Sequence, residues 1–364
     1  MSLKETESPI LSTETEPAIR LPDRQRIAAL NLIIIPIAIA CIGNVVYLTL
    51  GRGLFQYVKE VYFFNSILLP ILMLVLGIAA LAQGPRTRDW KMAAIVNFTG
   101  AATILAMRFW CSEIEPHWLA VREHTLITSK SAAPLRLLHL SDTQSPAVGR
   151  YEERTFRKIA ELKPDLILVT GDYLQPLKKY SWESEAPKLA ALFATVHPPL
   201  GIYGVGGDVD GDLRPLSKGG SGLSILEDQA VEIPWHGARI RLMGLSCSNS
   251  RFPDQEPVRQ WLEQGRPDDF NVLIGHAPDY IRKLKDLPID LCLAGHTHGG
   301  QVRVPFYGPP ITLSSVPREW ALGLHHIGNT WLNVSGGAGS EHINGIPAIR
   351  FNCPTEMSLV EIKK

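Results

Sequence analysis

The sequence predicts an α/β domain in which two facing sheets are flanked by helices, preceded by a block of membrane-spanning helices. Hydrophobic residues make up 45% of the 364 residues and are concentrated in the first third of the chain. From about Leu135, short β-rich runs alternate with helical or loop segments, as in layered α/β domains. We therefore expect a disordered tail at 1–25, a membrane region at 26–112 and a soluble domain at 135–364.

Three apolar stretches, at 27–50, 63–82 and 92–110, make up the membrane region. Each approaches the ~20 residues that a helix needs to cross a bilayer. The first two contain no charged residue, whereas the third contains Asn97, which could hydrogen-bond to another helix, and ends near Arg108. The sequence thus predicts a multi-pass membrane protein with three spans, or with two if the third stretch does not insert.

The short segments that flank these stretches set the expected orientation. Positive charges favour the cytoplasmic side, and this bias places the N-terminus inside. Three spans would then put the soluble domain on the outer face, which we favour, and two spans would put it in the cytoplasm. The charges on the inner side are Arg20, Arg24, Arg26, Arg86, Arg88 and Lys91, against Arg52 and Lys59 in the loop between the first two stretches.

Composition also excludes some classes of function. Lys plus Arg equals Asp plus Glu, at 36 each, so bulk charge gives no reason to expect a nucleic-acid partner. The five cysteines are scattered without CxxC spacing, which indicates neither a zinc ribbon nor a disulfide framework.

The soluble domain is expected to follow a regular order of strands and helices. The run at 166–170 is wholly apolar up to its last residue and predicts a fully buried strand, and the segment at 152–162 predicts an amphipathic helix. Further strands are predicted at 135–140, 201–205, 240–243, 271–275, 289–294, 331–334 and 357–362.

Five of the predicted strands end in clusters of Asp, Gln or His. Loops at the carboxyl ends of the strands of an open α/β sheet converge on one crevice, so these side chains are expected to meet. Mixed carboxylate and imidazole ligands suit Mn, Fe or Zn, and a shared carboxylate can bridge two such ions. An ion pair of this kind activates water and polarises a phosphoryl oxygen, which points to phosphoester hydrolysis. The clusters lie at 141–144, 171–172, 207–210, 275–276 and 295–298.

From about Leu135 onward, these clusters resemble the motif series of the calcineurin-like metallophosphoesterase superfamily: Asp-x-His, Gly-Asp, Gly-Asn-His-Asp, Gly-His and Gly-His-x-His. The segments at 295–301, 334–339 and 350–356 are similar to a bacterial membrane-associated branch related to lipid A pathway UDP-diacylglucosamine diphosphatases. The resemblance implies a two-sheet sandwich, two divalent metal ions and a place in a bacterial inner membrane.

Carried over position by position, the resemblance implies two metal sites that share Asp172. Three positions depart from the superfamily pattern: Gln144 replaces a His, Asp208 replaces an Asn, and Val209 replaces the His that supports the leaving group. Loss of that general acid would cost roughly 10²–10⁴-fold in rate. The implied ligands are Asp142, Gln144, Asp172 and His298 for the first site, and Asp172, Asp208, His276 and His296 for the second.

Other residues receive weaker assignments. Asp172, Asp208 and Asp210 form the expected catalytic set, and Arg303 and Arg350 are candidates to bind substrate phosphate, because Arg can form a bidentate fork. His139 is expected to be a half-buried strand residue. One of the surface residues His325, His326 and His342 could replace the missing acid.

The predicted function is a membrane-tethered, metal-dependent hydrolase of phosphoester or pyrophosphate bonds with a phosphorylated small-molecule or lipid substrate. The substrate could carry a lipid or a nucleotide. The alternative is a non-catalytic metal-binding relative that acts as a sensor or scaffold, and Gln144 and Val209 favour it. A protein phosphatase of the same superfamily is disfavoured by the apolar stretches.

Overall fold

The computed structural model describes residues 24–49, 53–83, 88–130, 133–218 and 220–364. The chain divides into two compact units, Met1–Leu105 and Ala106–Lys364, which are treated separately below. The predicted tail at 1–25 lies outside the described residues except for its last two positions, and so do Arg20, Arg52 and Arg86.

The first unit consists of helices rich in apolar residues. They are α1 (Arg24–Thr49), α2 (Leu54–Phe63), α3 (Leu69–Ala82), which continues from α2 through one π turn, and α4 (Arg88–Phe109), whose last residues belong to the second unit. Within the described residues, three helical segments are long and apolar enough to cross a membrane: Arg24–Val46, Leu54–Ala82 and Arg88–His117.

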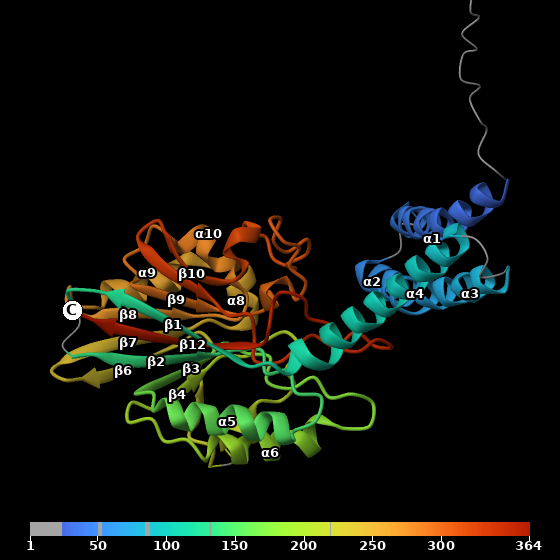
Figure 1. Ribbon diagram of the computed structural model, residues 1–364. Coiled ribbons are helices and arrows are strands. Elements are labelled where there is room, and N and C mark those ends of the chain that lie inside the picture. Colours follow the sequence, from blue (N-terminus) through green and yellow to red (C-terminus); the bar gives the residue numbers. More distant parts are fainter. Residues whose placement is uncertain (1–23, 50–52, 84–87, 131–132, 219) are drawn as a thin grey trace, which may run out of the picture. The chain divides into compact units, whose positions relative to one another are not determined.

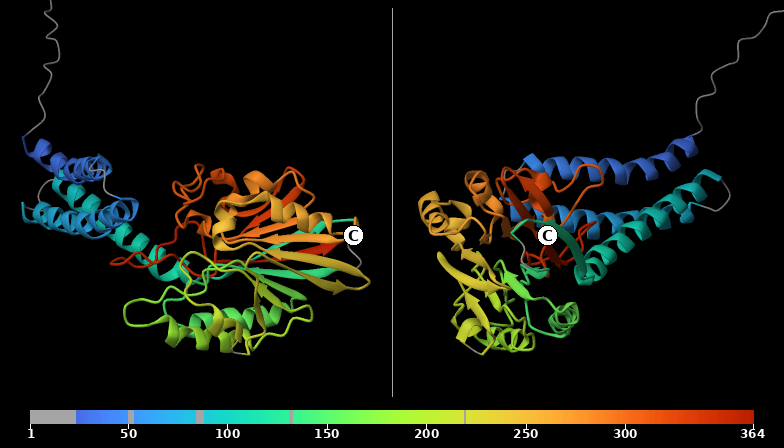
Figure 2. Two further views of the ribbon diagram at one scale, coloured as in Figure 1. Left: turned by 180° about the vertical axis from the view of Figure 1, so that it is seen from behind. Right: turned by 90° about the vertical axis from the view of Figure 1, so that its left-hand side faces the viewer.

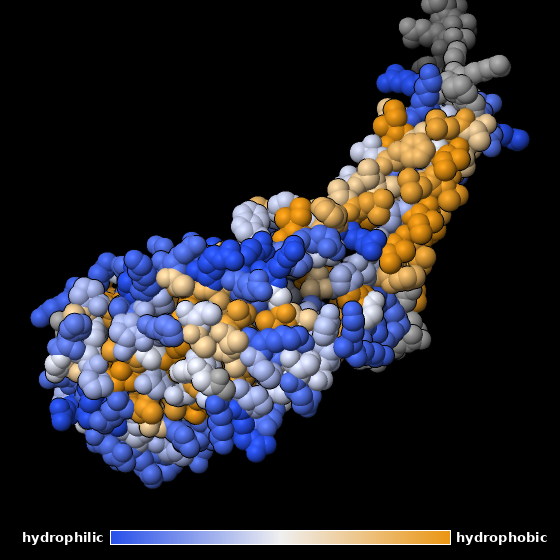
Figure 3. Space-filling model, turned by 90° about the horizontal axis from the view of Figure 1, so that it is seen from below, coloured by the Kyte–Doolittle hydropathy of each residue, from blue (hydrophilic) through white to orange (hydrophobic). Residues whose placement is uncertain are grey.

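Contacts between these helices follow the rules of helix packing in membranes. Small residues, among them Ala29, Ala80 and Ala93, form their buried centre. Asn97 donates a hydrogen bond from Nδ2 to the carbonyl oxygen of Leu32 at 3.1 Å, so it joins α4 to α1. Large apolar side chains such as those of Ile37, Ile42 and Ile78 lie on the outside, and Figure 3 shows hydrophobic residues covering these helices.

The second unit contains two six-stranded sheets. In the first sheet, every pair of neighbouring strands is parallel except β12 with β2. The order is β1 (Ala120–Ile127), β12 (Glu356–Lys363), β2 (Leu135–Leu140), β3 (Leu166–Val169), β4 (Ile202–Gly204) and β5 (Leu223–Ile225).

The second sheet has four parallel strands at its centre and an antiparallel pair at each edge. Its order is β10 (Gly323–Ile327), β11 (Thr330–Val334), β9 (Leu291–Ala294), β8 (Phe270–Ile274), β7 (Ala238–Gly244) and β6 (Gln229–Trp235).

The two sheets face each other across a buried apolar layer, and helices cover their outer sides. Successive side chains of β2 separate into two layers, because Leu137 packs between the sheets while Leu138 and Leu140 pack toward the helices. Figures 1 and 2 show α5 (Arg150–Leu162) and α6 (Trp182–Phe193) beside the first sheet, and α9 (Gln255–Glu263) and α10 (Ile281–Leu284) beside the second. The predicted fold of two facing sheets flanked by helices is thus confirmed.

Several elements were not predicted from the sequence. They are the strands β1, β5, β6 and β10, and the helices α6, α7 (Arg214–Lys218), α8 (Cys247–Arg251), α9 and α10. The strand β1 pairs with β12 along its whole length, so the first sheet includes a segment before residue 135.

Candidate metal centre

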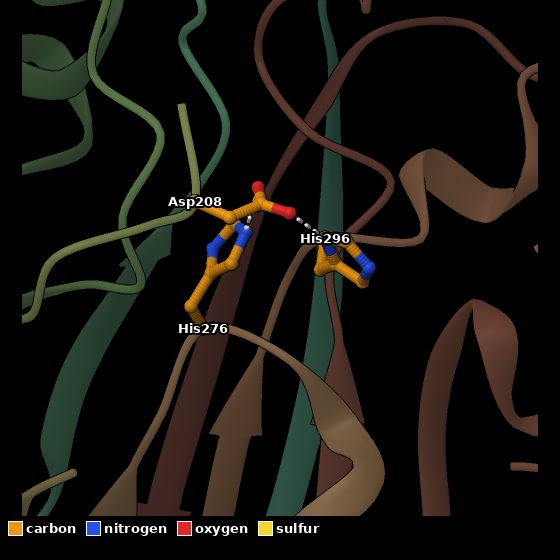
Figure 4. A group of neighbouring side chains, drawn as sticks. All are labelled: Asp208, His276 and His296. Atoms are coloured by element: carbon orange, nitrogen blue, oxygen red, sulfur yellow. Dashed lines mark hydrogen bonds and ion pairs between the residues drawn. The ribbon is translucent and has the colours of Figure 1, made fainter. Parts of the chain in front are cut away.

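The five polar clusters predicted from the sequence lie together at the carboxyl ends of β2, β3, β4, β8 and β9. Ligand atoms of Asp208, His276 and His296 lie within 4.8 Å of one another, and so do those of Asp142, Asp172 and His276. Figure 4 shows Asp208 close to both imidazoles, with each of the three side chains coming from a different strand tip. Both sheets therefore contribute to one site.

The backbone at this site is strained. Five of the seven predicted ligands are non-glycine residues with positive φ, a conformation that L-residues rarely adopt. Such strain persists only where surrounding structure enforces it, and it clusters at functional sites. The residues are Asp142 (φ 46°), Gln144 (35°), Asp172 (55°), His296 (66°) and His298 (49°).

Two glycines allow the strand tips to approach this closely. A Cβ atom on Gly295 would lie 1.9 Å from Ser141 Oγ and 2.1 Å from Asp142 Oδ2. A Cβ atom on Gly207 would lie 2.0 Å from Asp172 Oδ1. Because neither contact is possible for a real side chain, glycine at both positions is a condition for the cluster to form.

Asp142 is fully buried and its carboxylate receives several hydrogen bonds. The backbone N–H of His296 lies 3.0 Å from Oδ1, and Ser141 Oγ donates to Oδ2. The pKa of Asp142 is raised to about 7, because burial and the nearby carboxylate of Asp172 raise it by more than His276 lowers it. A cation beside these oxygens would favour the ionised form.

A chain of hydrogen bonds leads to Asp142 from the second sheet. Asn333 Nδ2 donates to His139 Nδ1 at 2.8 Å, so His139 Nε2 carries the proton and donates to Thr170 Oγ1 at 2.9 Å. Thr170 donates to Ser141 Oγ at 2.6 Å, and Ser141 donates to Asp142. Burial lowers the pKa of His139 to about 3, so it is neutral. The prediction of a half-buried His139 is wrong, because its side chain is fully enclosed.

His276 has the orientation of a metal ligand. Its Nδ1 lies 2.8 Å from the carbonyl oxygen of Thr170, to which it donates, so Nε2 points into the cluster. That nitrogen lies 3.2 Å from Asp208 Oδ1 and 3.4 Å from Asp172 Oδ2. Although burial alone lowers it, these carboxylates raise the pKa of His276 well above its ordinary value. The site thus favours positive charge.

Among the predicted ligands in the described part of the chain, two buried atoms have no hydrogen-bond partner: His298 Nε2 and Gln144 Oε1. Buried polar atoms nearly always have partners, so the orphaned His298 Nε2 is consistent with a ligand of a cation. His298 Nε2 lies 3.6 Å from Asp142 Oδ1. Burial, together with the charge of Arg350, lowers the pKa of His298 well below its ordinary value and keeps it in the neutral form that binds metals.

Gln144 faces the cluster with its amide nitrogen. Nε2 donates to Asp172 Oδ2 at 2.9 Å and to Glu341 Oε2 at 3.1 Å. The oxygen expected to ligate a metal therefore points away from Asp172. A ligand role for Gln144 needs the opposite amide orientation, which would also remove these two hydrogen bonds.

Asp172 and Asp210 differ in what surrounds them. Asp172 belongs to the group that it forms with Asp142 and His276, and its Oδ1 accepts from the backbone N–H of Val209 at 3.1 Å. The residue common to both groups is His276, so the bridging role of Asp172 stays a prediction. Asp210 accepts hydrogen bonds from the backbone N–H groups of Asp172 (2.9 Å), Tyr173 (2.7 Å) and Gly207 (2.7 Å). Its oxygens hold two loops together, so we assign it a positioning role in place of the expected catalytic one.

The surroundings of Arg350 contradict the prediction that it binds substrate phosphate. The guanidinium is fully buried and donates to Ser340 Oγ (2.8 Å) and to the carbonyl oxygens of Cys353 (3.0 Å) and Gly336 (2.7 Å). These hydrogen bonds hold the last loops of the chain together. Arg303 donates from Nη1 to the carbonyl oxygen of Gly299 at 2.9 Å. Its role in binding substrate phosphate stays a prediction.

Two residues at the site were missed in the sequence. Arg251, at the end of α8, donates to Asp208 Oδ2 and lies 3.1 Å from His296 Nε2. Glu341 accepts from Gln144 and, at 2.8 Å, from Gln175 Nε2. Arg251 could have been found by its position, because it lies in the segment that follows the predicted strand at 240–243.

The three histidines considered as replacements for the missing general acid lie in two different places. His342 lines a cavity that also contains Gln144. His325 and His326 lie on the edge strand β10, where His325 Nε2 bonds to the carbonyl oxygen of Leu322 and His326 packs on Trp331. His342 is therefore the alternative acid that the structure brings toward the cluster.

Comparison with known proteins identifies related sequences. Residues 135–300 match the calcineurin-like phosphoesterase family. The chain is 28% identical to the uncharacterised metallophosphoesterase YkuE of Bacillus subtilis (strain 168) over 260 residues, or 69% of this chain and 87% of the relative. It is 28% identical over 265 residues to the phosphodiesterase YaeI of Escherichia coli (strain K12), covering 68% and 90%. It is 24% identical over 312 residues to the UDP-2,3-diacylglucosamine pyrophosphatase LpxG of Chlamydia trachomatis, covering 69% and 91%.

Proposed function

We propose that this chain, whose residues 135–300 match the calcineurin-like phosphoesterase family, is a metal-dependent hydrolase of phosphoester or pyrophosphate bonds. The observation that carries the proposal is the convergence of Asp142, Asp172, Asp208, His276 and His296 from five strand tips. The similarity to a phosphodiesterase and to a UDP-2,3-diacylglucosamine pyrophosphatase supports this range of substrates.

The donor set fits two divalent ions of the Mn, Fe or Zn type. Asp142, Asp172 and His298, with Gln144 if its amide turns, would hold one ion, and Asp172, Asp208, His276 and His296 would hold the other. When bound, such a pair polarises phosphoryl oxygens and activates water for in-line attack. The fit rests on the orphaned His298 Nε2 and on the buried carboxylates that favour positive charge.

Arg251 is the residue that we assign to substrate phosphate. Its guanidinium is half-exposed and contacts Asp208 and His296, so it can reach an anion at the cluster while it stays held in place. A cavity on the outer side of Arg251 is also lined by Arg282 and Lys283, which adds to the attraction for anions. A guanidinium suits phosphate because it offers paired N–H donors.

The side chain at the position of the general acid cannot protonate a leaving group. Val209 carries no ionisable side chain, and its backbone N–H is used by Asp172. We therefore expect efficient turnover only for esters whose leaving groups need little help, unless His342 supplies the proton. This feature also favours the second candidate function, a non-catalytic relative that binds metal as a sensor or scaffold.

We place the enzyme in a membrane, because three of its described helical segments are long and apolar enough to span one. With three spans the catalytic unit faces the outer side of a bacterial inner membrane. A tether of this kind raises the effective concentration of any substrate that is itself in the membrane.

Hydrolysis by the full-length protein in nanodiscs tests the proposal. With Mn²⁺ supplied, we expect slow cleavage of bis(p-nitrophenyl) phosphate, loss of cleavage in Asp172→Asn, and no change in the matched surface variant Asp268→Asn. Metal binding by calorimetry without any turnover, in a folded sample, would support the non-catalytic relative instead.

A further inference from the structure

A cavity of about 870 Å³ extends from the metal centre in the second unit. Its lining includes Thr143 and Gln144, which follow the predicted metal ligand Asp142 in the sequence, and also Ser112 and His117. The functions considered above involve only Gln144 and His342 of its lining, and the space is large enough for a substantial part of a substrate beyond its phosphoryl group.

Much of the cavity wall is apolar. Leu177 in this wall is 43% exposed, and Ile343, Ile346 and Pro347 belong to a partly exposed loop that also lines it. Soluble proteins rarely leave such side chains clustered at the surface of a cleft without a ligand or partner. The wall therefore suits a flexible hydrocarbon chain.

The rim of the cavity carries excess positive charge. Arg150, Lys178 and Lys179 are exposed there, against Glu113 and Glu152. Glu152 is buried and caps its own helix by accepting from the backbone N–H of Gly149 at 2.8 Å, so it does not balance the rim. The net charge is complementary to an anionic ligand.

The end of the third apolar segment forms part of the cavity wall. Ser112, Pro116 and His117 belong to the last residues of Arg88–His117. Trp110 and Trp118 lie next to them in sequence, with their rings in edge contact at 6.1 Å and both partly exposed. Tryptophans at the end of an apolar helix are typical of the membrane interface. A molecule in a membrane could thus enter the cavity from that end.

We propose that this cavity binds the apolar chain of an anionic membrane amphiphile whose phosphoryl group lies at the metal centre. The inference rests on the proposed function and narrows its substrate from lipid or nucleotide to lipid. Apolar walls, a cationic rim and an opening beside a membrane-spanning segment are the features that a lipid phosphate would use.

A homologous series of p-nitrophenyl alkyl phosphates tests the cavity, because chain length changes while the leaving group stays the same. With the full-length protein in nanodiscs and Mn²⁺, we expect KM to fall from the ethyl to the octyl ester, by up to about fourfold for each methylene that becomes fully buried. The value of kcat should stay constant. Leu177→Asp and Ile346→Asp should flatten this dependence of KM on chain length.

Ile127→Asp is the matched control, because Ile127 is an exposed apolar residue at the end of β1 and does not line the cavity. The esters partition into the nanodisc in the same way with this variant as with the wild type. The variant should therefore keep the full dependence of KM on chain length. A flat KM in the wild type, or equal flattening by Ile127→Asp, would overturn the proposal. So would a nucleoside p-nitrophenyl phosphate that binds more tightly than the octyl ester and is sensitive to Leu177→Asp.

Failure of the proposed function gives a different result. If no ester is cleaved, calorimetry with ethyl and octyl phosphate still measures the cavity. Tighter binding of octyl phosphate, lost in Leu177→Asp and kept in Ile127→Asp, would support the chain-binding site without catalysis. Equal affinity for the two phosphates would contradict it.

Discussion

Asn333 donates a hydrogen bond from its side-chain amide to Nδ1 of His139 at 2.8 Å, which fixes the imidazole proton on Nε2. From there each hydroxyl donates onward until Ser141 donates to Asp142. A residue on β11 of the second sheet thus helps to hold the carboxylate of Asp142 as an acceptor, ready for a cation.

Asn333→Asp should reverse this chain, because a carboxylate accepts from Nδ1 and leaves Nε2 without its proton. Asp142 would lose a donor, and we expect Mn²⁺ affinity to fall by roughly 10–100-fold, as is usual when residues that support metal ligands are changed. Calorimetric titration measures this. Asn271→Asp is the control, since Asn271 is a buried residue of β8 outside the chain of hydrogen bonds. Equal losses in both variants would contradict the prediction.

The neutral state of His139 makes stability depend on pH. Its pKa is about 3 in the folded protein, against an ordinary value of 6.5, so the folded state binds fewer protons. Above pH 6.5, His139 does not lower the free energy of unfolding. As the pH falls from 6.5 toward 3, protonation of the unfolded state lowers that free energy by about 1.4 kcal/mol per pH unit. In the metal-free protein, we expect Tm to fall less between pH 7.5 and 5.5 in His139→Gln than in the wild type. Parallel falls would show that His139 does not contribute.

Gly295→Ala should disrupt metal binding, because the added methyl group would lie 1.9 Å from Ser141 Oγ. Either the loop or Asp142 must move, and we expect loss of measurable Mn²⁺ binding at the first site together with a lower Tm. Gly149→Ala meets nothing closer than 3.9 Å and serves as the control. Normal binding in Gly295→Ala would mean that the tips can separate without harm.

Arg251→Ala should weaken substrate binding. A hydrogen bond to a charged group contributes about 1.5–3 kcal/mol, so KM for a soluble ester should rise by roughly tenfold or more. Arg251→Lys should recover part of this, because it restores charge without the paired donors. Arg282→Ala, in the adjoining cavity, should have a smaller effect. A KM that does not respond to Arg251 would rule out its contact with phosphate.

Gln144→His tests whether this position takes part in metal binding. An imidazole is a better ligand than an amide for these ions, so the Mn²⁺ concentration for half-maximal activity should fall. Titration of the two proteins side by side gives the answer. If the curves overlay, Gln144 acts through its hydrogen bonds to Asp172 and Glu341 and not as a ligand.

The sequence predicts those parts of the fold in which local pattern and burial agree. The strands β3, β8 and β9 are buried on both sides and stand out as apolar runs. The strand β1 is an edge strand in which Arg122 and Glu123 are exposed, so its pattern resembles that of a loop. Its place in the sheet depends on pairing with β12, which no local signal reveals.

The same limit applies to the site. Short motifs after the strands predict which residues converge, because parallel strands bring their carboxyl ends together. They do not predict what each side chain bonds to. The oxygens of Asp210 and the guanidinium of Arg350 are used by backbone groups of other loops, and Arg251 reaches the cluster from a helix that has no motif.

The pairing of β1 with β12 constrains how the second unit can be made. Arg122 and Glu356 bond at 3.0 Å although they are 234 residues apart, and β12 lies between β1 and β2 in the sheet. During translation, β1 therefore leaves the ribosome long before its neighbour exists. The first sheet can close only after β12 has been synthesised, so β1 must stay without its neighbour in the sheet while the rest of the unit is made.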